Sequence, residues 1–195
     1  GIYLQNEQII SEKITVKYGL RYSLFDYLGP GNAYTYDAKG NILTKKEFSN
    51  GESIKMYGGL EPRLSARYQL NELSSVKASY NRNMQYLHIL SNSTTSSPTD
   101  IWVPSSNNVK PQIVNQIALG YFRNFNDNMF EFSLETYYKT LANQIDYKNG
   151  ANIFLNPDVE AELEYGKGQA YGAELYLHKQ TGRLTGWVSY TLSRS

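Results

Sequence analysis

The chain has no cysteine among its 195 residues, which excludes disulfide bonds and thiolate metal sites. It also has no stretch near the roughly 18 consecutive apolar residues that a membrane helix requires. The formal net charge of +1 provides no basic field for nucleic acid, so no nucleic-acid partner is expected. If this chain spans lipid, it spans it as strands.

Its composition combines many aromatic residues with a polar average. There are 18 Tyr, 7 Phe and 2 Trp, yet the mean hydropathy is -0.53. A β-barrel with a wet lumen produces this pairing, because each strand needs only one apolar face while the lumen and the outer loops are hydrophilic.

Strict alternation of apolar and polar residues is the clearest pattern. From Ile14 to Leu24 the even positions are apolar or aromatic and the odd positions mostly polar. This alternation predicts a strand with one apolar face and one water-facing polar face. Many of these runs exceed the roughly 5–6 residues of a globular strand and suit the roughly 9–11 residues of a tilted membrane strand. Eight strands are predicted, at 1–9, 14–24, 56–68, 74–87, 113–125, 130–138, 171–179 and 184–192.

The connections between these strands alternate between short and long. Tight turns are expected around 10–12, 70–73, 126–128 and 180–183, and long connections at 28–55, 88–112 and 141–170. In an up-and-down sheet this places every long connection on one rim, as in outer-membrane barrels. The fold prediction is therefore all-β, an antiparallel up-and-down transmembrane β-barrel segment, with residues 1–195 forming a partial β-barrel domain.

Three local features test this prediction. Arg82 falls on the lipid-facing parity of its strand, near the outer end, where it can snorkel to the interface. Pro62 cannot donate a ladder hydrogen bond, so a bulge is expected there. Residues 37–41 are typical of a hairpin tip inside the first long connection.

Both ends of the chain resemble the middle of a strand. Gly1 opens no secretion signal, and Ser195 follows a strand-like run without the terminal aromatic residue typical of outer-membrane barrels. We expect an internal fragment of a larger barrel.

Several segments resemble the barrel of TonB-dependent receptors of the Bacteroidetes type. The resemblance lies in residues 58–68 (GGLEPRLSARY), 107–112 and 116–121, and is strongest at 166–175 (GKGQAYGAEL) and 181–193. It implies a 22-stranded outer-membrane barrel, of which about eight strands lie here, filled by a plug domain that is absent from these residues. It also implies import of a scarce nutrient (metal chelate, vitamin, glycan or peptide), energised by TonB through the absent plug segment.

Two groups of candidate site residues follow, and neither is catalytic. Lumen-facing side chains expected to meet a plug or water are Lys17, Arg21, Glu61, Arg63, Arg67, Lys77, Glu131, Glu135, Glu174 and His178. Glu61 and Arg63 share a face and are a candidate ion pair. Loop residues that suit a ligand above the lumen are His88, Asp100, Trp102, Tyr147, Asn149 and Asn152.

The remaining candidate chemistry is sparse. Four carboxylates recur at every second residue: Asp158, Glu160, Glu162 and Glu164. On an extended segment this spacing places them on one side. A calcium site built from these oxygens and a solvated acidic arm both remain open as interpretations. The two histidines, His88 and His178, are too isolated to suggest a transition-metal site. Neither a cofactor nor an enzymatic activity is expected.

Two other classes of protein remain open at this point. One is a self-contained eight-stranded outer-membrane adhesin or structural barrel. The other is a soluble carbohydrate-binding β-sandwich, in which Ile14, Val16, Leu20, Leu134 and Val188 would converge on a dry interior.

Overall fold

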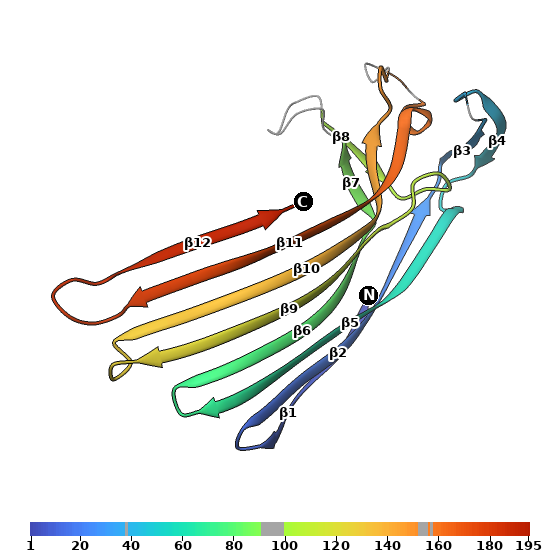
Figure 1. Ribbon diagram of the computed structural model, residues 1–195. Coiled ribbons are helices and arrows are strands. Elements are labelled where there is room, and N and C mark those ends of the chain that lie inside the picture. The colour runs from blue at the N-terminus through green and yellow to red at the C-terminus, as the bar shows by residue number, and fades with distance from the viewer. Residues whose placement is uncertain (38, 91–99, 152–155, 157) are drawn as a thin grey trace.

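The computed structural model describes residues 1–37, 39–90, 100–151, 156 and 158–195. Its main body is one eight-stranded antiparallel sheet with the order β1-β2-β5-β6-β9-β10-β11-β12. Figure 1 shows this sheet as a curved open wall, with β1 and β12 at its two edges. The strands are β1 Ile2–Ser11, β2 Ile14–Leu28, β5 Ser53–Asn71, β6 Ser74–Gln85, β9 Gln112–Phe125, β10 Phe130–Tyr147, β11 Leu163–Lys179 and β12 Gly186–Arg194.

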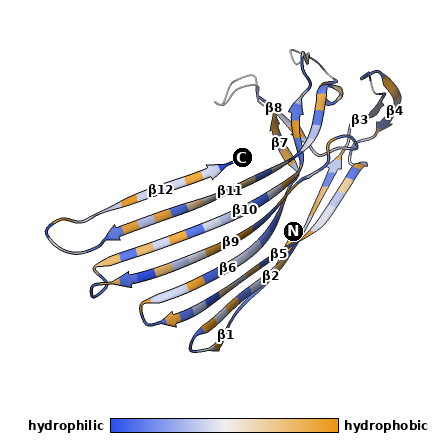
Figure 2. Ribbon diagram, viewed as in Figure 1, coloured by the Kyte–Doolittle hydropathy of each residue, from blue (hydrophilic) through white to orange (hydrophobic). Residues whose placement is uncertain are grey.

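The pairing register aligns the apolar residues of neighbouring strands on one face. Leu134, for example, lies between Tyr121 of β9 and Leu175 of β11, and Leu20 pairs with Leu4 of β1. Because side chains alternate along a strand, one in-register match fixes the face of the whole strand. The bands of apolar and polar residues along each strand are visible in Figure 2.

The apolar face is uncovered. Leu20 is 47% exposed, Leu134 40% and Val188 65%. These side chains do not converge on a dry interior, so the β-sandwich alternative is wrong. The described sheet is also not closed, since β1 pairs only with β2 and β12 only with β11, whereas a self-contained eight-stranded barrel would need β1 and β12 to pair.

Short turns and long connections lie at opposite ends of the sheet, as the sequence predicted (Figure 1). The turn between β9 and β10 holds Asn126, Asp127 and Asn128 at φ of 55°, 52° and 61°. Asn and Asp tolerate this left-handed region better than other non-glycine residues, which explains the turn residues at this position. We call the end with the long connections the loop rim.

The long connections carry structure of their own. β3 Gly31–Tyr36 and β4 Ile42–Phe48 form a hairpin, β7 Leu87–Leu90 and β8 Ile101–Pro104 form a second, and η1 Val159–Glu162 is a 3-10 helix. The predicted hairpin tip is confirmed: Asp37 Oδ1 accepts hydrogen bonds from the backbone N–H groups of Lys39 and Asn41. No helix in the described part of the chain is long and apolar enough to cross a membrane.

A small apolar cluster joins the connections at the loop rim. Leu90, Val103, Val109 and Leu163 are each at most 4% exposed and pack together. They come from β7, β8, the segment before β9 and the start of β11, so segments far apart in sequence share one core. Burial of these side chains stabilises the rim through the hydrophobic effect.

The expected bulge at Pro62 is wrong. The register between β2 and β5 runs without interruption through Leu20 and Pro62. On the other side of β5, pairing with β6 ends at Arg63 and Asn81, one residue before the proline. Because proline has no backbone N–H, it can end the hydrogen-bonded ladder between two strands instead of forming a bulge in it.

Between Pro62 and the loop rim, β5 and β6 no longer pair with each other, and side chains pack between the strands. The Tyr86 hydroxyl lies 2.7 Å from Ser23 Oγ, and its ring stacks on Phe25. Met84 lies directly over Gly59, where a Cβ would collide with its sulfur. Arg82 keeps the predicted parity, opposite Asn115, but its Nε is buried.

Candidate functional site

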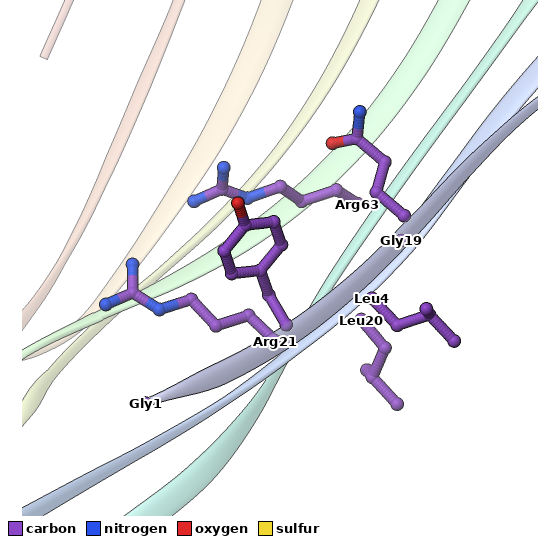
Figure 3. Close-up of a pocket in the computed structure, with 8 residues that line it drawn as sticks. Gly1, Leu4, Gly19, Leu20, Arg21 and Arg63 are labelled. Atoms are coloured by element: carbon purple, nitrogen blue, oxygen red, sulfur yellow. The ribbon is translucent and has the colours of Figure 1, made fainter.

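The concave face of the sheet carries the predicted polar set. Figure 3 shows Arg21 and Arg63 on the opposite side of the strands from Leu4 and Leu20. These arginines border a hollow of about 400 Å³ with Gly1 and Gly19. A second hollow of about 510 Å³ continues across β6 to Gln116.

Charge on this face is divided between the two halves of the sheet. The side that includes β2, β5 and β6 carries most of the basic residues: Lys17, Arg21, Arg63, Arg67 and Lys77. The side that includes β10 and β11 carries Glu131, Glu135 and Glu174, of which Glu135 and Glu174 are direct cross-strand partners. Like charges placed opposite each other repel unless a cation or a hydrogen-bond donor lies between them.

Among the described residues, few of these groups lie within ion-pair distance of an opposite charge. Lys17 Nζ lies 3.6 Å from Glu7, and His178 Nδ1 lies 3.8 Å from Glu131. Glu61 is only 2% exposed, and no ion pair between it and Arg63 is present among the described residues. Arg63 donates instead to Asn83 Oδ1 at 3.2 Å.

Arg67 and Lys77 face each other across β5 and β6. Arg67 donates to Gln69 Oε1 at 2.7 Å and forms no ion pair with a carboxylate in the part of the chain that the structure describes. The concave face therefore retains exposed charge of both signs.

The second candidate region is a cleft of about 230 Å³ at the loop rim, which we call the rim cleft. Tyr27, Asn32, Tyr34, Tyr36, Ile101, Trp102, Val103, Pro104, Ser106, Asn107, Val159 and Glu160 line it. Because β3 alternates, Asn32, Tyr34 and Tyr36 share one face of the hairpin. The lining therefore comes from β2, β3, β8, η1 and the segment that follows β8.

Hydrogen bonds hold the pieces of the rim cleft together. Asn107 and Asn108 both donate to the carbonyl of Tyr34, at 2.6 and 3.0 Å. Asn108 also donates to Glu160 Oε2 at 2.6 Å, and the Tyr57 hydroxyl donates to the carbonyl of Ser106 at 2.7 Å. These hydrogen bonds link all three long connections to one another and to β5.

Tyr36 is the lining residue of the rim cleft that lies beside two carboxylates. Burial, followed by the negative charges of Asp158 and Glu160, raises the pKa of Tyr36 well above its usual range. The Tyr36 hydroxyl is 3.5 Å from Asp158 Oδ1. The phenol is therefore held neutral as a donor toward the acidic side of the cleft.

Six loop residues were put forward as ligand contacts, and of the five that the structure describes only Trp102 lines the rim cleft, where it is 62% exposed. His88 is 1% exposed and bonded to Ser105 Oγ at 3.0 Å. Tyr147 packs against the apolar cluster, Asn149 lies in an exposed turn, and Asp100 is half-buried. Asn152 lies outside the described residues.

The four alternating carboxylates do not lie on one extended side. Glu160 and Glu162 are in the 3-10 helix η1, and Glu164 is in β11. With about three residues per turn, alternate residues of such a helix point in different directions. No group of three or more ligating side chains that would hold a metal occurs in the described residues.

Sequence reasoning missed Tyr34, Tyr36, Asn107 and Glu160 as a group. The spacing of Tyr34 and Tyr36 at i and i+2 beside a hairpin tip was a usable signal, because it places both rings on one face. The convergence of β3 with residues 107 and 160 depends on tertiary packing of the rim and has no local signature.

Comparison with known proteins identifies the family. All of residues 1–195 match the sequence profile described as "TonB dependent receptor-like, beta-barrel", and the chain belongs to this family of TonB-dependent receptor β-barrels. A search of curated proteins gave no significant match.

Solved structures of similar fold come from several bacteria. The FrpB iron transporter of Neisseria meningitidis is 18% identical with a TM-score of 0.61, over 98% of this chain and 24% of that one. The alcaligin outer-membrane receptor FauA of Bordetella pertussis is 15% identical with a TM-score of 0.59, over 98% and 29%. The ferric-catecholate import receptor Fiu of E. coli K12 is 15% identical with a TM-score of 0.57, over 98% and 27%. The chain thus spans about a quarter of the length of these structures.

Proposed function

We propose that this chain is part of the barrel wall of an outer-membrane receptor that imports a scarce nutrient with energy supplied through TonB. The observation that carries the proposal is the match of the whole chain to the receptor barrel family, on a sheet with one uncovered apolar face and one charged concave face. The nutrient is a metal chelate, a vitamin, a glycan or a peptide.

The proposed partners of this chain are inferred from the faces of its sheet and from the two edge strands. Lipid of the bacterial outer membrane covers the apolar face, because exposed leucines such as Leu64 and Leu119 are costly in water. The remaining strands of the parent barrel pair with β1 and β12, whose outer backbone groups need partners. We assign the parent to the Bacteroidetes type on the motifs at 58–68 and 166–175.

A plug domain is the proposed partner of the concave face. Lys17, Arg21, Arg63, Arg67 and Lys77 would meet acidic groups of the plug, and Glu131, Glu135 and Glu174 basic groups, with Glu61 beneath them. Charged hydrogen bonds of this type are stronger than neutral ones and fix orientation. The plug in turn carries the segment that contacts TonB.

Deletion of the gene that encodes the parent protein tests this function. Growth is measured on media in which iron, cobalamin, glycan or peptide is in turn the limiting nutrient. We expect a growth defect in one medium, restored by the intact gene and not by a version lacking the plug. Recovery of the protein in the soluble fraction, or normal growth and uptake in all media, would contradict the proposal.

A further inference from the structure

The rim cleft has a chemical character distinct from that of the concave face. Its described lining contains four aromatic residues and one carboxylate, and no Lys or Arg. The concave face, in contrast, is rich in arginine and lysine. An anionic ligand group would find no positive counter-charge among these lining residues.

Glu160 supplies a fixed negative charge to the rim cleft. Its Oε2 accepts a hydrogen bond from Asn108 at 2.6 Å, which orients the carboxylate without neutralising it. Lys148, on the same connection, donates from Nζ to the carbonyl of Ala161 at 2.7 Å. Burial is the main cause of the raised pKa of Tyr36, and the nearby carboxylates of Asp158 and Glu160 raise it further.

Aromatic rings provide the other half of the site. Tyr34 and Tyr36 lie with their ring centroids 6.2 Å apart and tilted by 32°, and Trp102, which also lines the cleft, is 62% exposed. The faces of such rings carry negative quadrupole charge and attract cations within about 6 Å. Rings and carboxylate therefore favour the same sign of ligand charge.

The size of the cleft limits what it holds. At about 230 Å³, it is smaller than the roughly 300–1,000 Å³ of pockets that enclose a drug-sized ligand. It therefore suits one head group or side chain of a larger compound.

We propose that the rim cleft binds an organic cation, a substituted ammonium group, against Tyr34, Tyr36 and Trp102 with Glu160 as counter-ion. This rests on the proposed import function, since the cation would be part of the imported compound. The site thus selects compounds by positive charge at the loop rim.

Binding of choline to the complete receptor, purified in detergent, tests this site. Saturation-transfer NMR and titration calorimetry are used with choline and its uncharged isostere 3,3-dimethylbutan-1-ol, and with glucose as a neutral sugar. We expect choline to bind at least about tenfold more tightly than the isostere, and glucose not to bind.

Two substitutions locate the effect. Glu160→Gln keeps the size of the side chain and should weaken choline binding about tenfold, and Trp102→Ala should weaken it as well. Glu162→Gln, in the same 3-10 helix but outside the cleft lining, should leave binding unchanged. Heat-modifiable migration in gels shows that each variant is folded.

Equal binding of choline and the isostere, unchanged binding by the Glu160 variant, or binding of glucose alone would each overturn the proposal. Failure of the import function is a separate result, because it appears as normal growth of the deletion strain whatever the purified receptor binds.

Discussion

At the scale of single residues, close packing between strands constrains β11 more than its exposed position suggests. A Cβ added at Gly172 would lie 2.8 Å from the carbonyl oxygen of Leu192 and 3.0 Å from the ring of Tyr137. A Cβ at Gly168, four residues earlier on the same strand, would meet only the Leu141 side chain at 3.5 Å. A backbone oxygen cannot move away without distorting the β11–β12 ladder.

Gly172→Ala should therefore destabilise the folded receptor by about 1–3 kcal/mol, the usual cost of overpacking. Gly168→Ala, with ordinary van der Waals contact, serves as the matched control. Urea unfolding of the detergent-solubilised receptor, followed by gel mobility, measures the difference. Equal midpoints for the two variants would show that β12 shifts freely.

A titratable residue at the loop rim makes stability there depend on pH. Burial lowers the pKa of His88 below its usual value, so in the folded hairpin the ring resists protonation. In the unfolded segment His88 takes up a proton near pH 6.5. Stability from the neutral ring is thus complete above about pH 6.5 and is lost as the pH falls below it.

The β7–β8 hairpin should open more often as the pH is lowered from 7.5 to 5. Hydrogen exchange of peptides covering 87–90 and 101–104, corrected for the intrinsic exchange rate, measures this opening. In His88→Gln the pH dependence should disappear. Protection that stays constant in the unmodified receptor would refute the assignment.

At the scale of strands, consecutive residues of one strand lie on opposite faces of the sheet, one apolar and one polar. Ala78 pairs with Ala66 and Leu119 on the apolar face, whereas Ser79 pairs with Ser65 and Ala118 on the concave face. A charge is expensive on the lipid side near the middle of the membrane and tolerated in a hydrated lumen.

Ala78→Arg should cost about 2–4 kcal/mol of stability, and Ser79→Arg much less. Both variants are refolded into lipid vesicles, and the folded fraction is titrated with guanidinium. An equal loss for the two variants would mean that the apolar face does not contact lipid.

The strands of the wall were predictable, but the structure of the loop rim was only partly so. Alternation runs the full length of each wall strand, so residues such as Leu20 and Leu134 identified their faces unaided. The turn-forming residues around Asp37 predicted the hairpin tip there. The β7–β8 hairpin and η1 were not predictable in this way, because the burial of residues such as Leu90 and Leu163 depends on a cluster assembled from different long connections of the rim.

The same limit applies to the candidate site. The concave set was predicted from the parity of each strand, and by register its members share one face of the sheet, while their contact with a plug is a proposal. The rim cleft depends on contacts such as that of Asn108 with Glu160, 52 positions apart. Neither alternation nor turn composition encodes a pairing of that kind.

At the scale of the whole molecule, the two free edges determine how this chain behaves alone. β1 and β12 each have one neighbour in the described sheet, and Leu4 and Leu192 on them are 80% and 64% exposed. Open edges with exposed apolar residues promote association between chains.

Residues 1–195 expressed alone should aggregate on refolding into detergent, whereas the complete receptor should give a monodisperse, heat-modifiable species. Size-exclusion chromatography and gel mobility distinguish the two. A compact monomer from the isolated chain would instead favour closure of eight strands on themselves.

The apolar cluster at the loop rim has a consequence for grafting between receptors. Leu90, Val103 and Val109 lie in the connection between β6 and β9, whereas Leu163 begins β11 after the next long connection, and all four are buried together. If a single connection were transplanted into a related barrel, its apolar side chains would lose their packing partners. The recipient would also be left with a cavity in its own cluster. Chimeras with a related barrel should therefore fold correctly only when residues 86–111 and 148–163 are exchanged together.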